Sequence, residues 1–387
     1  MSDPTIIENA RIILAEEVIE NGYVAFDGGQ IAEIGEGQAP GRGQVNRIDA
    51  NGDMLLPGLV ELHTDHLEAH VQPRPKVQWN AVSAVVSYDA QIATSGITTV
   101  LDSLRVWREE GSAEAADGQA ALLSDAIDRA RAAGLLRVDH FLHLRCEVPM
   151  PKVVIDAADL ITRPDVRLLS LMDHTPGQRQ FQDAGKLRDY YRGKSGGMTE
   201  AELDEMFARR IAHSEQYAPQ NYKGLVELAQ KHGTPLASHD DTTSEHVEQA
   251  IKDRVAIAEF PTNVASAEGL HANGIKVMMG APNLVRGGSH SGNVATAELA
   301  RAGLLDLMSS DYVPSSLLLA ALMLPKAAPN YDLPAAIRTV SKTPAEAVGL
   351  NDRGEIATGK RADAILVHVA PDGAAVRSVW SGGRRVA

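Results

Sequence analysis

The chain of 387 residues contains a single cysteine, Cys146, and no apolar run as long as a membrane span. One cysteine excludes an internal disulfide, and we expect its thiol to be buried and inert. Basic residues are also scarce. The chain has 37 Lys and Arg but 51 Asp and Glu, which gives a formal charge of -14. This balance argues against general nucleic-acid binding. It does not exclude an anionic substrate, which a local cluster of Arg and Lys with metal ions can bind.

The N-terminus carries acidic residues and Arg11 in place of a basic, apolar signal sequence. We therefore predict a cytoplasmic protein with no membrane partner. Internal repeats and low-complexity tracts are absent as well. A barrel of about 250 residues with one smaller domain accounts for the length. The sequence leaves open whether the chain forms a homo-oligomer.

The most informative segment, residues 56–68, reads Leu-Pro-Gly-Leu-Val-Glu-Leu-His-Thr-Asp-His-Leu-Glu. Its apolar part predicts a buried strand, which ends in four potential metal ligands, His63, Asp65, His66 and Glu68. Because side chains alternate along a strand, His63 and Asp65 are expected to point the same way and could hold one ion. The alternative interpretation is a polar loop after a core strand.

Other apolar runs end in similar residues. Three of them reach His174, His239 and Asp311, and the alternating segment 137–147 delivers Glu147 to the barrel axis. Packing alone does not require polar residues at the same end of every strand. The pattern therefore predicts an enzyme site at the carboxyl ends of parallel strands.

Helical stretches at 117–133, 199–231, 244–253 and 295–302 separate these strands. Alternation of this kind implies a parallel sheet with crossover helices, and we predict an α/β fold of the (β/α)8 TIM-barrel class. The eight predicted strands end near His63, Asp102, Glu147, Asp173, His239, Phe260, Met279 and Ser310.

The two ends of the chain have a different character. Residues 1–56 and 351–387 contain short alternating runs that are broken by turn signals such as Gly28-Gly29. We predict that both ends pair in one small β-sandwich domain beside a metal-dependent catalytic barrel at 57–350.

Longer motifs carry a resemblance to a known family. They include Asp-His-Thr-Pro-Gly-Gln-Arg-Gln-Phe at 173–181, Ser-His-Asp-Asp-Thr-Thr at 238–243 and Arg-Gly-Gly-Ser-His-Ser-Gly-Asn at 286–293. Residues 50–350 resemble the amidohydrolase superfamily, and within it the triphosphate diphosphatases of the carbon-phosphorus lyase pathway. The resemblance implies a hydrolase acting on phosphoric anhydride bonds in phosphonate catabolism. Its implied substrate is a phosphorylated sugar, alpha-D-ribose 1-methylphosphonate 5-triphosphate, cleaved to the 5-phosphate and pyrophosphate.

The resemblance also implies a binuclear metal centre. The first metal would take His63, Asp65 and Asp311, the second His174 and His239, and Glu147 would bridge them. Many superfamily members have His-x-His on the first strand, whereas here Asp65 takes the second position. His66 and Glu68 therefore remain alternative ligands. Two divalent ions of zinc, manganese or iron suit this ligand set, and the sequence does not choose among them.

Asp311 is the expected catalytic proton acceptor. Five residues on predicted loops are expected to bind the phosphates: Arg74, Arg179, Lys194, Arg286 and His290. The Gly-rich stretch around Lys194 predicts a phosphate cradle. The alternative interpretation of this stretch is an ordinary loop before a helix that begins near Thr199. Thr199 and Glu202 have nearly the spacing of a capping box.

Two other functions stay open. One keeps the metal site but acts on a cyclic amide, an N-acyl group or an aminopurine. The other is an inactive barrel that serves as a binding or assembly protein, although a scaffold has no need of so many ligand-type residues together. The sequence does not decide which phosphorus is attacked or whether nucleoside triphosphates are accepted.

Overall fold

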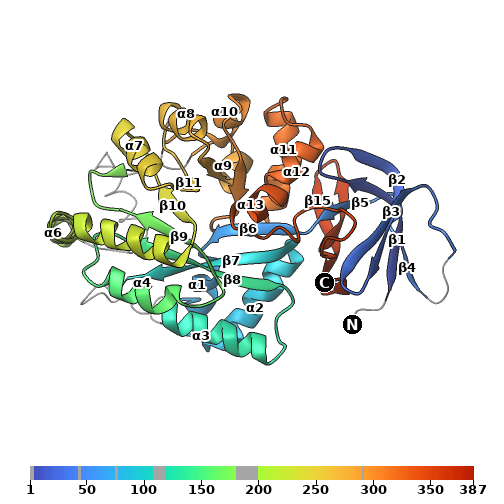
Figure 1. Cartoon of the computed structure of the whole chain (residues 1–387), viewed down its shortest axis with the longest axis horizontal. Helices are drawn as coiled ribbons and strands as arrows, with labels where there is room; N and C mark the ends of the chain where they lie inside the picture. Colours follow the sequence, from blue (N-terminus) through green and yellow to red (C-terminus); the bar gives the residue numbers. More distant parts are fainter. Residues whose placement is uncertain (1–3, 42–44, 75–76, 108–118, 180–198, 290–291) are drawn as a thin grey trace.

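The computed structural model describes residues 4–41, 45–74, 77–107, 119–179, 199–289 and 292–387. Within these ranges the strands form two sheets of eight strands each, and helices surround one of them (Figure 1). None of the helices in these ranges has the length and apolar character that crossing a membrane requires.

The larger unit is a nearly closed barrel, which confirms the predicted (β/α)8 class. Its strands follow the chain order and all pair in parallel. They are β6 (Leu59–Thr64), β7 (Ile97–Val106), β8 (Asp139–Glu147), β9 (Val166–Met172), β10 (Leu236–His239), β11 (Ile257–Glu259), β12 (Lys276–Gly280) and β13 (Leu307–Ser309).

Helices follow the strands and cover the outside of the barrel (Figure 1). The described ones are α1 (His66–Val71), α2 (Ala81–Thr94), α3 (Gln119–Ala132), α4 (Val153–Ile161), α6 (Glu200–His232), α7 (Ser244–Lys252), α8 (Val264–Ala272), α9 (Ala281–Arg286), α10 (Thr296–Arg301), α11 (Ser316–Ala327), α12 (Leu333–Arg338) and α13 (Lys342–Ala347).

Helix α6 begins where the sequence predicted. Thr199 is its N-cap and forms a complete capping box with Glu202, which satisfies backbone N–H groups that the first turn cannot pair internally. The helix ends at Gly233, whose φ of 67° is the left-handed conformation that glycine adopts without strain.

Two apolar cores hold the barrel. The inner core takes one buried side chain from most strands, including Leu62, Leu101, Leu168 and Ile257. The outer core lies between the strands and the helices and includes the single cysteine, Cys146, which is buried as expected. These two layers fix the strand ends, so that side chains beyond the inner core must gather in one place.

The second sheet combines both chain ends, as predicted. Its order is β16-β15-β14-β5-β1-β2-β3, and β4 pairs with β1. The strands are β1 (Thr5–Ile13), β2 (Val18–Asp27), β3 (Gln30–Glu36), β4 (Asn46–Asp49), β5 (Met54–Pro57), β14 (Ala364–Ala370), β15 (Gly373–Ser381) and β16 (Arg384–Arg385).

This sheet curls over a small core of its own. Phe26 on β2 and Trp380 on β15 are far apart in the strand order, yet their ring centroids lie 6.2 Å apart. Only Gly58 separates β5 of this sheet from β6 of the barrel. A Cβ atom at Gly58 would lie 2.2 Å from Oγ1 of Thr98, so the junction requires glycine.

Candidate metal centre

A cavity of about 860 Å³ opens at the carboxyl ends of the barrel strands. All six predicted metal ligands line it: His63, Asp65, Glu147, His174, His239 and Asp311. The first of them lies on β6 and the last follows β13, so only the barrel brings them together. The cavity volume suits a substrate of nucleotide size.

Half of these side chains lie on the strands themselves. Glu147 and His239 are the last residues of β8 and β10, and His63 is the penultimate residue of β6. Asp65 differs, because β6 ends at Thr64 and Asp65 is the N-cap of α1. The expected alternation of His63 and Asp65 along one extended strand therefore stops before Asp65.

Glu147 and His174 form the closest pair in the cavity. The backbone N–H of His174 donates to Oε1 of Glu147 at 2.8 Å, and its Nδ1 lies 2.7 Å from Oε2. Burial alone would raise the pKa of Glu147, but the charge and hydrogen bonds of His174 outweigh it and lower that pKa. Burial likewise opposes protonation of His174, yet the Glu147 carboxylate raises its pKa.

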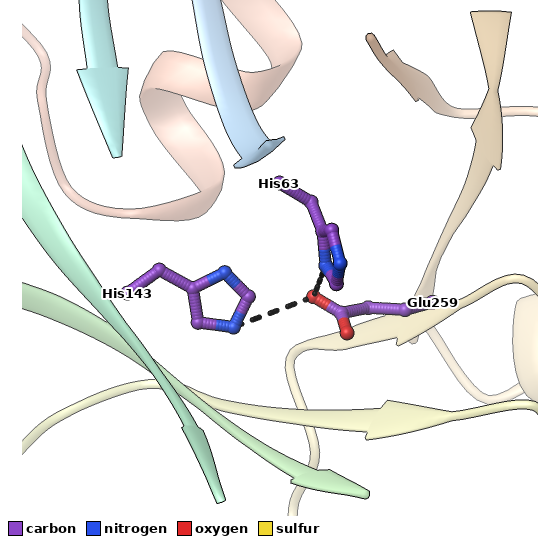
Figure 2. Close-up of side chains that lie close together, drawn as sticks. All are labelled: His63, His143 and Glu259. Carbon is purple, nitrogen blue, oxygen red and sulfur yellow. Dashed lines mark ion pairs between the residues drawn. The ribbon is translucent and has the colours of Figure 1, made fainter. Parts of the chain in front are cut away.

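Glu259 ends β11 between several imidazoles (Figure 2). Nδ1 of His239 lies 2.9 Å from Oε2 of Glu259, and Nδ1 of His63 lies 3.0 Å from Oε1. The rings of His63 and His239 are stacked at a centroid distance of 5.6 Å, and Phe260 packs edge-on against both. One fully buried carboxylate thus contacts two candidate ligands from different strands.

His143 on β8 lies next to Glu259 and His63. Its Nδ1 lies 2.9 Å from the carbonyl oxygen of Leu62, which can only accept, so Nδ1 carries the proton. Burial lowers the pKa of His143 to about 3 and keeps the ring neutral. Nε2 then accepts from the Ser170 hydroxyl at 2.9 Å, and its 3.6 Å separation from Glu259 is a weaker contact.

Two arginines hold Asp65. Oδ2 of Asp65 lies 3.2 Å from Nη1 of Arg145 and 3.4 Å from Nη2 of Arg105. Burial would raise the pKa of Asp65, but these guanidinium groups lower it. The two alternative ligands are also engaged, since Nε2 of His66 lies 3.1 Å from Gln91 and Glu68 pairs with Arg105 at 3.1 Å.

Two further carboxylates have pKa values suited to proton transfer near neutral pH. Burial and the nearby charge of Asp65 raise the pKa of Asp311 to about 7. Burial also raises the pKa of Asp240 to about 7, although His174 opposes the shift. The backbone φ is 53° at Asp311 and 54° at Asp240. This left-handed conformation costs energy in residues other than glycine and often marks a functional site.

The side chains fit divalent cations. Two groups among the described residues hold their ligand atoms within 4.8 Å of one another: His63, His143 and Glu259, and His174, His239 and Asp240. His63 Nδ1, Glu259 Oε1 and Asp240 Oδ2 are buried and form no hydrogen bond of good geometry, although His63 Nδ1 and Glu259 Oε1 lie 3.0 Å apart. Such buried polar atoms are costly unless something satisfies them, and imidazole with carboxylate is a donor set that a bound cation would satisfy.

The predicted phosphate ligands have different positions. Arg286 lines the cavity, whereas Arg179 donates to the His239 carbonyl at 2.6 Å and pairs with Asp241, so it braces the end of β10. Arg74 is exposed and is not among the described residues that line the cavity. Lys194 and His290 lie outside the described residues.

Sequence reasoning did not single out several residues of the site. Asp240, Arg145 and Arg210 line the cavity, and Glu259 belongs to the group with His63 and His143. Glu259 stands one position before Phe260, where a strand end was predicted, and its carboxylate was a usable signal. Arg145 shares the inward face of β8 with Glu147, so alternation already placed it at the axis. Arg210 lies on α6, and only tertiary packing brings it to the cavity.

Comparison with known proteins agrees with this geometry. The amidohydrolase family model matches residues 54–386. The alpha-D-ribose 1-methylphosphonate 5-triphosphate diphosphatase of Escherichia coli (strain K12) is 42% identical over 98% of this chain and 100% of its own. An adenine deaminase of Nitratidesulfovibrio vulgaris (strain DP4) is 25% identical over 99% of this chain but only 57% of its own. The structure of molinate hydrolase superposes with a TM-score of 0.66 at 16% identity, covering 100% of this chain and 95% of that one. The chain belongs to the amidohydrolase family.

Proposed function

We propose that this amidohydrolase hydrolyses alpha-D-ribose 1-methylphosphonate 5-triphosphate to the 5-phosphate and pyrophosphate in phosphonate catabolism. The relative with that activity aligns along its whole length with this chain. The observation that carries the proposal is that one cavity is lined by members of two His-carboxylate groups and by four arginines, Arg105, Arg145, Arg210 and Arg286. A polyphosphate needs both cation sites and positive side chains.

We propose two divalent cations, with zinc, manganese and iron all chemically suitable. His63, Asp65 and Asp311 would hold the first, His174 and His239 the second, and Glu147 would lie between them. Asp240 belongs to the same compact group as His174 and His239 and would support the second cation. When bound, such ions make hydroxide available near neutral pH and neutralise phosphoryl charge.

Asp311 is the proposed proton acceptor. A carboxylate beside the attacking water can take a proton from it and later pass that proton on, and Asp311 lines the cavity with the other proposed ligands. The hydrogen bond from its backbone N–H to the His63 carbonyl, at 3.2 Å, keeps the carboxyl group beside the first strand.

The arginines bind the negative charge of the substrate. Arg105 and Arg145 already neutralise Asp65 and Glu68, so this side of the cavity carries little net charge. Arg286 makes no ion pair with any described residue and lines the cavity from the end of α9. We assign it to the polyphosphate, since a charge-assisted contact to phosphate contributes about 1.5–3 kcal/mol.

An amide or aminopurine substrate would use the same His-carboxylate groups but would offer no negative charge to Arg286, which makes no ion pair with any described residue. A binding protein would need neither the left-handed Asp240 and Asp311 nor the orphaned buried atoms. Hydrolysis of a phosphoric anhydride uses both the His-carboxylate groups and the cavity-lining Arg286.

The test begins with protein purified with its native metal. The metal-to-chain ratio is measured, and the ribose alkylphosphonate triphosphate is assayed for pyrophosphate against orthophosphate. Stoichiometric pyrophosphate is expected, and Asp311→Asn and Glu147→Gln should each abolish it. Asp306→Asn is the matched control, because Asp306 precedes β13 at the opposite end from Asp311 and binds the backbone of Val277. Bound metal without pyrophosphate would overturn the substrate, and protein without metal would overturn the metal centre.

A further inference from the structure

The seam between the first and last barrel strands is not closed by a backbone ladder. Among the described strands, β6 and β13 stand at the two ends of the hydrogen-bonded order. At the amino end of this seam, the N–H groups of Val60 and Met308 donate to the carbonyls of Val340 and Thr339, both at 2.9 Å. The backbone after α12 thus replaces direct pairing there.

At the carboxyl end of the seam, a side chain replaces direct pairing of the two strands. Glu61 is fully buried, with 0% exposure. Its Oε1 accepts from the N–H of His63 and its Oε2 from the N–H of Ser310, each at 2.6 Å. One carboxylate therefore satisfies a backbone donor on each side of the seam, and buried donors of this kind are costly to leave unpaired.

The bonds next to Glu61 join two candidate metal ligands. The N–H of Asp311 donates to the carbonyl of His63 at 3.2 Å, and the hydroxyl of Thr64 donates to the carbonyl of Asp311 at 2.7 Å. His63 and Asp311 are thus held to each other across the seam by their backbones. Their separation depends on how closely the two strands approach at Glu61.

We propose that Glu61 is a positioning residue that sets the spacing of His63 and Asp311 across the barrel seam. The inference rests on the proposed metal centre, in which both residues are ligands. Glu61 is not among the described residues that line the cavity. It acts through the backbone that carries the ligands and has no contact of its own with substrate.

A carboxylate is the side chain that this position requires. Two N–H groups converge on it from different strands, so two acceptor atoms on one planar group are needed. Glutamine keeps one acceptor but turns an NH2 group toward the second N–H. Aspartate keeps both acceptors on a shorter side chain and would draw the strands out of position.

The experiment measures metal affinity and backbone protection separately from activity. Apoprotein is prepared with a chelator, Zn2+ affinity is obtained by chelator competition, and hydrogen exchange is followed at the amides of His63 and Ser310. Glu61→Gln should lower Zn2+ affinity by about 10- to 100-fold, as loss of support for metal ligands typically does. Both amides should exchange faster. Glu61→Asp should fall between this variant and the wild type.

Asp89→Asn is the matched control. Asp89 is also a fully buried carboxylate, on α2, and it accepts from the backbone N–H groups of Arg137 and Val138 at 2.8 and 3.1 Å. It does not line the cavity in the described part of the chain. Asp89→Asn should lower stability yet preserve both Zn2+ affinity and protection at His63 and Ser310.

Wild-type Zn2+ affinity with unchanged exchange in Glu61→Gln would overturn the proposal. If Glu61→Gln does not fold, unchanged Zn2+ affinity in Glu61→Asp would overturn it instead. A wild-type protein that binds none of Zn2+, Mn2+ and Fe2+ would overturn the metal centre itself, and the proposal with it, because Glu61 would have no ligands to position. The first two results leave the proposed function standing, and the third does not.

Discussion

Nδ1 of His239 donates to the carboxylate of Glu259 at a distance of 2.9 Å. Because the carboxylate can only accept, this contact fixes the proton on Nδ1 and leaves the lone pair on Nε2. Nε2 faces Oδ2 of Asp240 at 3.4 Å, so two electron-pair donors meet inside the cavity. Glu259 therefore selects the tautomer in which His239 can bind a cation.

Glu259→Gln should lower the affinity for divalent cations by about 10- to 100-fold, because the amide cannot accept from His239 and face His63 in the same way. Chelator competition with Zn2+ measures the change. Glu268→Gln, on the exposed side of the following helix α8, is the control and should leave the affinity unchanged. Equal affinity in both variants would show that Glu259 is only a packing residue.

Arg286→Ala should raise KM for the ribose triphosphate by about tenfold or more, since about 1.5–3 kcal/mol of charge-assisted binding is lost. Steady-state kinetics of pyrophosphate release provide the measurement. Arg74→Ala should have a much smaller effect, because Arg74 is exposed and away from the described cavity lining. A larger effect of Arg74→Ala than of Arg286→Ala would place the polyphosphate beside Arg74, which was predicted together with Arg286 as a phosphate ligand.

The buried His140 should make stability depend on pH. Burial disfavours its charge, but Asp102 at 2.9 Å and Asp89 at 3.3 Å outweigh this and raise its pKa from 6.5 to about 9. A raised pKa contributes stability that is complete below pH 6.5 and is lost as pH rises through 9. The whole contribution is at most about 3 kcal/mol.

Urea unfolding of the wild type and His140→Gln at pH 6, 7.5 and 9 tests this expectation. The difference in unfolding free energy between the two proteins should shrink toward higher pH. A difference that stays constant across this range would mean that His140 is neutral in the folded protein.

Cys146 should resist thiol reagents in the folded protein. Burial, with a smaller effect from the nearby Glu147 charge, raises the pKa of its thiol well above the usual range. The thiolate is the reactive form, so the native rate should be negligible. A colorimetric disulfide reagent should detect one thiol per chain only after denaturation. Rapid reaction of the native protein would show that the outer core opens at β8.

Strand ends could be predicted because their physical signal is local. An apolar run that stops at a polar residue marks the end of a buried strand wherever the chain later folds. Glu147 and His239 end β8 and β10 as predicted, and β11 ends at Glu259, one residue before Phe260. The prediction was wrong for β7, which continues past Asp102 to Val106. A different local signal, short alternating runs broken by turn residues, led to the prediction that both chain ends form a separate sheet.

Contacts between strands could not be predicted in this way. Glu61 stands inside an apolar run, and only the meeting of β6 with β13 gives its carboxylate two partners. Asp65 looked like part of an extended strand, but α1 begins immediately after it. Arg145 and Arg105 meet Asp65 only when β6, β7 and β8 are side by side. These pairings depend on tertiary structure, which local periodicity does not encode.

The pairing of β5 with β14 joins residues 54–57 to residues 364–367, with the whole barrel between them in the chain. A ribosome completes β5 long before β14, so one edge of β5 lacks its neighbour throughout synthesis of the barrel. Unpaired edges of this kind invite pairing with other chains. Because β5 leads through Gly58 directly into β6, the last strands to be made also anchor the first strand of the barrel. We therefore expect nascent chains that lack β14 to be the species most exposed to aggregation and to need chaperone protection.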